Sequence, residues 1–332
     1  MKIVAWGNGS GSQMWRLEHP FKVLRSLGID ANVCHDAVSE KYLEWADIAI
    51  LQSCVHKESI ALAYKYQQEN GLKLIVESDD WVEVNEDNPH KLEHDVLDAV
   101  FTIQRTMEVS DAITTTQDYI SDKIKTINKN TFVLPNYIYL KEWDLPKYKN
   151  ESENIRIFWA GSMTHIEDMK LVVNPLKRIC KEFPQVQLIF MGDLRIGDLF
   201  DGCNVENMLG VPVEAWPIKL STIRADIGIA PLVDNEFNRC KSNIKWLEYG
   251  INQIPSVCSP TRYGESIKNG ETGYIANTEE EWYEYLKKLI LDKDLRIKIG
   301  MNAYEEIKSK WSLEGNIQKW VDVYESLTKK VK

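Results

Sequence analysis

Four residues between positions 238 and 250 have the types and spacing of an anion-binding site: Lys241, Ser242, Lys245 and Glu248. Residues three and four apart share a helix face, so Lys241, Lys245 and Glu248 are predicted to line one side of a single helix. Two lysines one turn apart repel each other and oppose the dipole near a helix start. A bound anion would reverse both effects. First-turn N–H groups, the Ser242 hydroxyl and two ammonium groups suit a diphosphate, and Glu248 suits sugar hydroxyls.

The same stretch also fits a plainer interpretation. Beside the charged positions lies an apolar stripe of helical spacing, formed by Cys240, Ile244, Leu247 and Ile251. A helix that buries such a stripe commonly carries charged residues on its solvated side. The spacing alone leaves an anion site and an ordinary solvated face equally open.

A second group of candidates follows the strand expected at 72–76. Asp79 and Asp80 stand just after that strand, and open α/β sheets bind ligands at the carboxyl ends of their strands. An aspartate here could orient an acceptor hydroxyl or act as a base, although turn or helix-capping chemistry accounts for one of the two. His94 stands four residues after His90, but no further metal-ligand spacing accompanies this pair. We therefore expect no metal site.

A glycine-rich loop follows the first expected strand, which covers 2–6. Gly7, Gly9 and Gly11 separate that strand from a helical pattern over 15–27. Glycines allow backbone N–H groups to approach a ligand closely where a helix begins. The glycine spacing differs from the dinucleotide-binding fingerprint, so a nicotinamide-dependent oxidoreductase is not expected.

The rest of the chain alternates strands and helices, which predicts parallel sheets and an α/β fold. Strands of the first half are expected at 2–6, 30–35, 48–52, 72–76, 110–116 and 132–136. The segment 140–153 is polar, contains Pro146 and suits a linker. Strands of the second half are expected at 155–160, 187–191, 205–211, 227–232, 255–259 and 270–276. Helices are expected at 61–68, 118–127, 167–183, 238–250, 279–291, 294–310 and 313–329.

Length and composition are those of a soluble two-domain protein. The chain has 332 residues, 44% of them hydrophobic, and 11 tryptophans, which argues against disorder. Its net charge of −10 disfavours a general polyanion binder. The six cysteines are scattered, no apolar run reaches the ~18 residues that span a bilayer, and the first residues read as a strand rather than a signal peptide. These features predict that the protein resides in the reducing cytoplasm.

With these pieces placed, the chain resembles the retaining family-four glycosyltransferases of the GT-B fold, which use nucleotide sugars. The resemblance covers nearly the whole length. Its most specific part runs from Asp226-Ile227-Gly228-Ile229-Ala230-Pro231-Leu232 through Asn238, Lys241-Ser242, Lys245 and Leu247-Glu248-Tyr249 to Pro255-Ser256-Val257. Further matches are Phe158-Trp159-Ala160-Gly161-Ser162 with His165 and Asp168, Glu77-Ser78-Asp79-Asp80, Ser110-Asp111-Ala112 with Thr114, and Leu134-Pro135-Asn136.

The resemblance implies two Rossmann-like domains facing across a cleft. Residues 1–148 would form the acceptor domain, residues 149–311 the nucleotide-sugar domain, and the helix within 312–332 would cross back to the first domain. The residues it implies for donor binding are Gly9, Gly11, Gly161, Ser162, Val211, Lys241, Ser242, Lys245 and Glu248. Those with catalytic roles are Lys241, Lys245 and Asp80, and the acceptor-side candidates are Arg16, Asp79, Asp80 and His94.

The expected reaction moves a sugar from a nucleoside diphosphate sugar to an acceptor hydroxyl with retention of configuration. The expected donor is a UDP-sugar. The two lysines would neutralise the departing diphosphate, and no cofactor or metal is expected. One departure concerns Cys240, which stands where many family members carry a first glutamate that contacts the transferred sugar. Glycan, lipid-linked sugar and a hydroxymethylated pyrimidine in phage-type DNA remain open as acceptors. A GT-B epimerase and a catalytically weak nucleotide-sugar binding protein remain open as alternatives.

Overall fold

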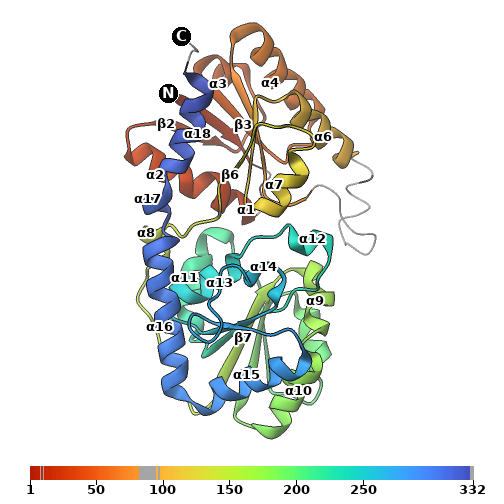
Figure 1. Cartoon of the computed structure of the whole chain (residues 1–332), viewed down its shortest axis with the longest axis vertical. Coiled ribbons are helices and arrows are strands. Elements are labelled where there is room, and N and C mark those ends of the chain that lie inside the picture. Colours follow the sequence, from red (N-terminus) through yellow and green to blue (C-terminus); the bar gives the residue numbers. More distant parts are fainter. Residues whose placement is uncertain (8, 10, 82–94, 96–97, 330–332) are drawn as a thin grey trace. The chain divides into compact units, whose positions relative to one another are not determined.

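The computed structural model describes residues 1–7, 9, 11–81, 95 and 98–329. These residues form two compact units (Figure 1). The first unit contains residues 1–137, 239–242 and the described part of 313–332, and the second contains 138–238 and 243–312. Each unit is built on one parallel sheet of six strands.

The sheet of the first unit has the strand order β2-β1-β3-β4-β5-β6. Its strands are β1 Lys2–Trp6, β2 Asp30–Cys34, β3 Ile48–Gln52, β4 Lys73–Ser78, β5 Ala112–Thr115 and β6 Thr131–Val133. All neighbouring strands are parallel. Every residue of β3 is buried, as expected for a central strand covered on both faces.

Helices connect these strands and cover the sheet of the first unit. They are α1 Gly11–Gln13, the π-helix Met14–Glu18, α2 His19–Ser26, α3 Glu40–Trp45, α4 Lys57–Asn70, α6 Ala99–Val109, α7 Asp118–Ile124, α17 Leu313–Asn316 and α18 Gln318–Thr328. Gly28 ends the first helical stretch with φ +81°, a left-handed conformation that glycine adopts without strain. The last helix, α18, belongs to this unit (Figure 1). Its Trp320 packs edge-on against Tyr137.

The sheet of the second unit has the order β12-β11-β10-β7-β8-β9. Its strands are β7 Ile155–Gly161, β8 Val186–Gly192, β9 Val205–Met208, β10 Ile227–Ala230, β11 Ser256–Cys258 and β12 Tyr274–Ile275. Its α-helices are α8 Leu140–Trp143, α9 Ile166–Lys170, α10 Val173–Glu182, α11 Trp216–Ile223, α13 Ile244–Ile251, α14 Pro260–Tyr263, α15 Glu279–Leu291 and α16 Lys293–Lys310. Its 3-10 turns are Met163–His165, Leu194–Phe200 and Val213–Ala215. Helix α12, Glu236–Arg239, lies where the chain leaves this unit.

The single helix predicted over 238–250 is wrong. Helix α12 ends at Arg239, α13 begins at Ile244, and residues 240–243 between them are not helical. Lys241 and Lys245 therefore do not stand one turn apart on one helix, and Cys240 does not share a stripe with Ile244. The cause is tertiary: Cys240 is fully buried in an apolar cluster of the first unit, which outweighs a weak helix preference.

Several smaller differences concern other helices. The helix predicted over 167–183 is two helices, α9 and α10, and the one over 313–329 is α17 and α18. The segment 140–153 contains the short helix α8, whose Trp143 is buried. Helices α3, α6 and α11 were not predicted. Along the described residues, no helix combines the length and the hydropathy that crossing a bilayer requires.

Candidate functional site

Helix α13 brings two of the predicted donor-binding residues to one place in the second unit. It follows β10, so it begins near the carboxyl end of the sheet, where α/β proteins bind ligands. Its last six residues, Trp246 to Ile251, are all buried. Lys245, in its first turn, donates from Nζ to the carbonyl oxygen of Ala160 at 2.8 Å. The lysine thereby lies against the end of β7.

Glu248 is a buried carboxyl group, with a residue exposure of 8%. Its Oε1 accepts a hydrogen bond from the indole Nε1 of Trp216 at 2.8 Å. Desolvation raises the pKa of Glu248 to about 7, and the charge of Lys245 and the Trp216 hydrogen bond oppose that rise. Because this pKa is close to neutral pH, a ligand that donates hydrogen bonds to the carboxylate would shift Glu248 towards its ionised form.

Glycines expose the backbone at the carboxyl ends of β7 and β8. A Cβ on Gly161 would approach the indole of Trp159 to 2.5 Å, and one on Gly192 would come within 2.2 Å of the carbonyl oxygen of Gly161. Gly192 also has φ +110°, a backbone conformation that favours glycine. Ser162, the next residue along β7, is exposed, and its Oγ lies 2.8 Å from Oγ1 of Thr164. Glycine thus lets these two strand ends pack closely, and small polar groups follow β7.

Val211, the remaining donor-side candidate of the second unit, is 36% exposed and follows β9. It belongs to the same sheet edge as Gly161, because β7, β8 and β9 are neighbours in the sheet. The structure thus groups Gly161, Ser162, Val211, Lys245 and Glu248 in the second unit.

Lys241 and Ser242 belong to the first unit, within the crossing segment 239–242. Ser242 accepts a hydrogen bond at Oγ from Nδ2 of Asn136 at 2.9 Å. The carbonyl oxygen of Arg239 accepts another from Nε2 of Gln117 at 2.7 Å. These bonds and the burial of Cys240 hold the segment. The two lysines predicted to act together are therefore carried by different units.

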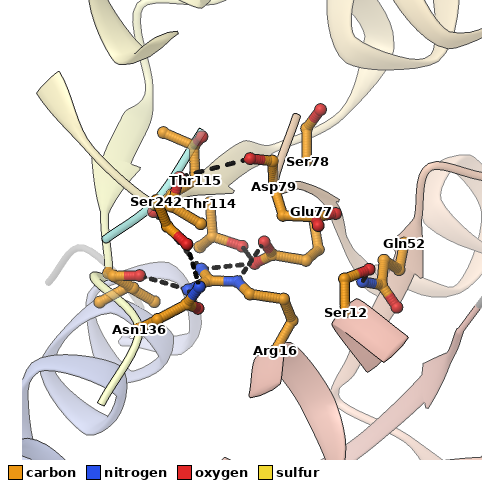
Figure 2. Close-up of polar contacts among 12 residues, drawn as sticks. Ser12, Arg16, Gln52, Glu77, Ser78, Asp79, Thr114, Thr115, Asn136 and Ser242 are labelled. Atoms are coloured by element: carbon orange, nitrogen blue, oxygen red, sulfur yellow. Dashed lines mark hydrogen bonds and ion pairs between the residues drawn. The ribbon is translucent and has the colours of Figure 1, made fainter. Parts of the chain in front are cut away.

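Arg16 lies at the centre of a buried polar network in the first unit (Figure 2). Its Nε and Nη2 donate to the two carboxylate oxygens of Glu77 at 2.7 and 3.2 Å. Its Nη1 donates to Oδ1 of Asn136 at 3.0 Å and to the carbonyl oxygen of Leu134, and Nη2 also reaches that of Thr115. All five N–H bonds of the guanidinium are used. The network ties together residues at the carboxyl ends of β4, β5 and β6.

Asp79 lies beside this network at the end of β4, next to Glu77 (Figure 2). Burial raises the pKa of Asp79 to about 6, as do the negative charges of Asp80 and Glu77, while Arg16 and a Ser12 hydrogen bond oppose the rise. Thr114 donates to Glu77 through its hydroxyl. The pKa of Asp79 is thus brought towards neutral pH. His94 lies outside the described residues.

The glycine loop after β1 is organised by one side chain. Oε1 of Gln13 accepts from the backbone N–H of Gly9 at 2.9 Å, and a Cβ on Gly7 would come within 2.1 Å of that oxygen. Gly9 has φ +72°, and Gly11 begins α1. The loop therefore needs glycine at both Gly7 and Gly9, and its role towards phosphates stays a prediction.

Sequence reasoning missed one residue of this site, Trp216. Its helix α11 was not predicted, and nothing in the spacing around it pointed to a hydrogen bond with Glu248, which is 32 residues away. Glu77 and Asn136 were noticed only as parts of wider matches. Among the described residues, no group of three or more His, Cys, Asp or Glu side chains is arranged to hold a metal ion.

Comparison with known proteins identifies the fold. No family model and no curated protein sequence matches the chain. Solved structures of glycosyltransferases do match it, and the two sheets with their helices form the GT-B fold. HepE of Anabaena, solved with UDP and glucose, has a TM-score of 0.68 and 11% identity over 98% of this chain and 100% of its own.

Two other solved structures are also similar to the chain. A putative UDP-N-acetylglucosamine 2-epimerase from Listeria monocytogenes has a TM-score of 0.61 and 12% identity over 100% of this chain and 98% of its own. A TarM mutant of S. aureus, solved with fondaparinux, alpha-GlcNAc-glycerol and UDP, has a TM-score of 0.64 and 14% identity. The match covers 86% of this chain and only 57% of TarM.

Proposed function

We propose that this protein transfers a sugar from a nucleoside diphosphate sugar to an acceptor hydroxyl with retention of configuration. The donor we propose is a UDP-sugar. The observation that carries the proposal is Glu248 on α13. It is a buried carboxyl group with a pKa of about 7, three residues after Lys245. Two hydroxyls of a ribose would supply donors to its ionised form, and Lys245 would meet the diphosphate. UDP in the HepE structure fits this donor class.

In the proposed reaction, the acceptor oxygen forms a bond to the anomeric carbon on the face from which the diphosphate leaves. The bond from that carbon to the β-phosphate oxygen breaks, and its electron pair stays on the diphosphate. Lys245 would stabilise this growing negative charge. The acceptor proton passes to a phosphate oxygen, so the chain needs no nucleophile of its own.

The first unit would supply the acceptor side. Asp79, once ionised, would accept a hydrogen bond from the acceptor hydroxyl and so orient it. Arg16 and Glu77 would hold the strand ends around it, since all five guanidinium N–H bonds already have acceptors. We propose a hydroxyl of a glycan or lipid-linked sugar as the acceptor, because a net charge of −10 disfavours a DNA substrate.

A thermal-shift titration tests the donor half of the proposal. UDP and UDP-sugars should raise the melting temperature, since a ligand at 100 times its dissociation constant adds about 2.7 kcal/mol. Lys245→Ala should weaken the shift by UDP far more than that by uridine. If no uridine nucleotide shifts the wild type at millimolar concentration, or Lys245→Ala leaves the UDP shift unchanged, the assignment is wrong.

The structural likeness to a putative epimerase favours a second candidate, epimerisation of the bound sugar. The two reactions differ in their need for an acceptor. Incubating the protein with UDP-sugars alone and following the sugar by NMR would reveal a new epimer if the second candidate is right. Transfer instead requires added glycan or lipid-linked acceptor and releases UDP in step with a new glycosidic bond.

A further inference from the structure

A histidine–aspartate pair lies at the end of β7 in the second unit, outside the residues assigned above. Nδ1 of His165 and Oδ2 of Asp168 are 2.7 Å apart. The other oxygen, Oδ1, accepts from the backbone N–H of Val233 at 2.7 Å and from Nδ2 of Asn238 at 2.8 Å. Asp168 is buried, with an exposure of 3%. Two N–H donors and the imidazole therefore surround its carboxyl group.

Asp168 fixes the state and the orientation of the imidazole. A carboxylate only accepts, so Nδ1 of His165 must carry the hydrogen. The ring also packs edge-on against Trp159, with centroids 6.0 Å apart and an interplanar angle of 81°. Its position is therefore set from two sides.

Lys245 lies against the same indole. Its Nζ is 5.6 Å from the ring centroid of Trp159, and it donates to the carbonyl oxygen of Ala160, the next residue along β7. Lys241, the second cation expected from the sequence, is carried by the other unit. His165 is a second basic side chain that contacts Trp159 within the second unit.

We propose that His165, positioned by Asp168, is a diphosphate-binding residue of the donor site and works with Lys245 as its second positive charge. The inference rests on the proposed function, because it assigns a residue to the phosphates of the same nucleotide. Asp168 is a positioning residue: it also ties Val233 and Asn238 to α9, and so fixes the loop before the crossing segment relative to the imidazole.

The test compares ligands that differ only in phosphate. Calorimetric titrations with uridine, UMP and UDP are run on the wild type, His165→Gln and His165→Lys. Glutamine can still donate an N–H to Asp168 but carries no charge, whereas lysine keeps the charge. We expect His165→Gln to weaken UDP binding by about 10-fold to 100-fold, the cost of one charged hydrogen bond. Uridine affinity should stay unchanged, and His165→Lys should recover most of the UDP affinity.

The possible outcomes test the inference and the proposed function separately. If UDP binds His165→Gln as tightly as the wild type, the inference is overturned while the proposed function stands. Equal losses for uridine and UDP, or no recovery in His165→Lys, would make the pair structural only and also overturn it. If the wild type binds none of the three ligands, the proposed function fails too. His56→Gln, at an exposed histidine of the first unit, is the control and should match the wild type.

Discussion

Replacing Glu248 by glutamine should stabilise the protein above pH 7 while weakening its nucleotide affinity. Burial moves the pKa of this carboxyl group from 4.5 to about 7. One pKa unit corresponds to about 1.4 kcal/mol, so keeping Glu248 ionised in the folded protein costs about 3 kcal/mol. Glutamine has nearly the same shape, keeps an oxygen for the Trp216 indole, and carries no charge.

The sign of the pH dependence follows from proton binding. The folded state holds the Glu248 proton more tightly than the unfolded state, so stability is lost as pH rises from about 4.5 to 7. Below that window the acid is neutral in both states, and wild type and Glu248→Gln should differ little. At pH 5 we expect a difference of under about 1 kcal/mol, and at pH 8 about 3 kcal/mol in favour of the variant.

Thermal and urea unfolding at pH 5 and pH 8 measure this difference. For a domain of about 150–250 residues, 1 kcal/mol shifts the melting temperature by about 2–4 °C, so the gain at pH 8 should be about 6–12 °C for the second unit. Glu284→Gln, at an exposed position on α15, is the matched control and should change neither value. A variant that is less stable at pH 8, or one whose gain is the same at both pH values, would refute the reasoning.

The same group should give nucleotide binding a pH dependence. Ribose hydroxyls donate hydrogen bonds to the ionised carboxylate, so the wild type should bind uridine and UDP more tightly as pH rises through about 7. Glu248→Gln should lose this dependence and weaken both ligands alike, unlike His165→Gln, which should affect UDP alone. Calorimetry at pH 6 and 8 separates the two.

Three further perturbations test the rest of the structure. Arg16→Met breaks a buried ion pair and should lower the free energy of unfolding by about 3–5 kcal/mol, measured in urea, whereas Arg105→Met, at an exposed pair, should cost under about 1 kcal/mol. Asp79→Asn should lower kcat/KM for the acceptor about 10-fold to 100-fold without changing UDP affinity. The wild-type rate should rise as pH passes about 6. If Asp80→Asn shows that loss and Asp79→Asn does not, the role belongs to Asp80. Gly228→Ala would bring a Cβ within 2.6 Å of a tyrosine ring and should lower the melting temperature, since overpacking costs about 1–3 kcal/mol; an unchanged melting temperature would contradict it.

The sequence predicts the strands well, because their signal is local. Buried parallel strands are short apolar runs ended by glycine or polar residues, as at Ile48–Gln52 and Lys73–Ser78. The main failure is the stretch after β10, where helical spacing continues across a break. Nothing near Cys240 indicates that its side chain is buried in the core of the first unit, so a periodicity argument could not find the break.

The candidate site, like the fold, could be predicted from the sequence only where the signal is local. Lys245 and Glu248 keep the spacing expected of them because α13 is a true helix around both residues. Trp216 could not be found, because its hydrogen bond to Glu248 depends on how α11 packs and not on any motif. The Asp79 environment likewise depends on Arg16, which is 63 positions earlier in the chain. Residues that act through distant neighbours carry no local signal.

The crossing segment 239–242 also bears on how the chain acquires its structure during synthesis. The chain passes between the units four times, so the first unit is not a contiguous piece of sequence. A ribosome that has released residues 1–137 has not yet made Cys240 or α18. The first unit can complete its core only after the second unit has been translated. Splitting the gene near residue 138 should therefore yield an N-terminal fragment that aggregates or is degraded, and co-expression of both pieces should be needed to recover it.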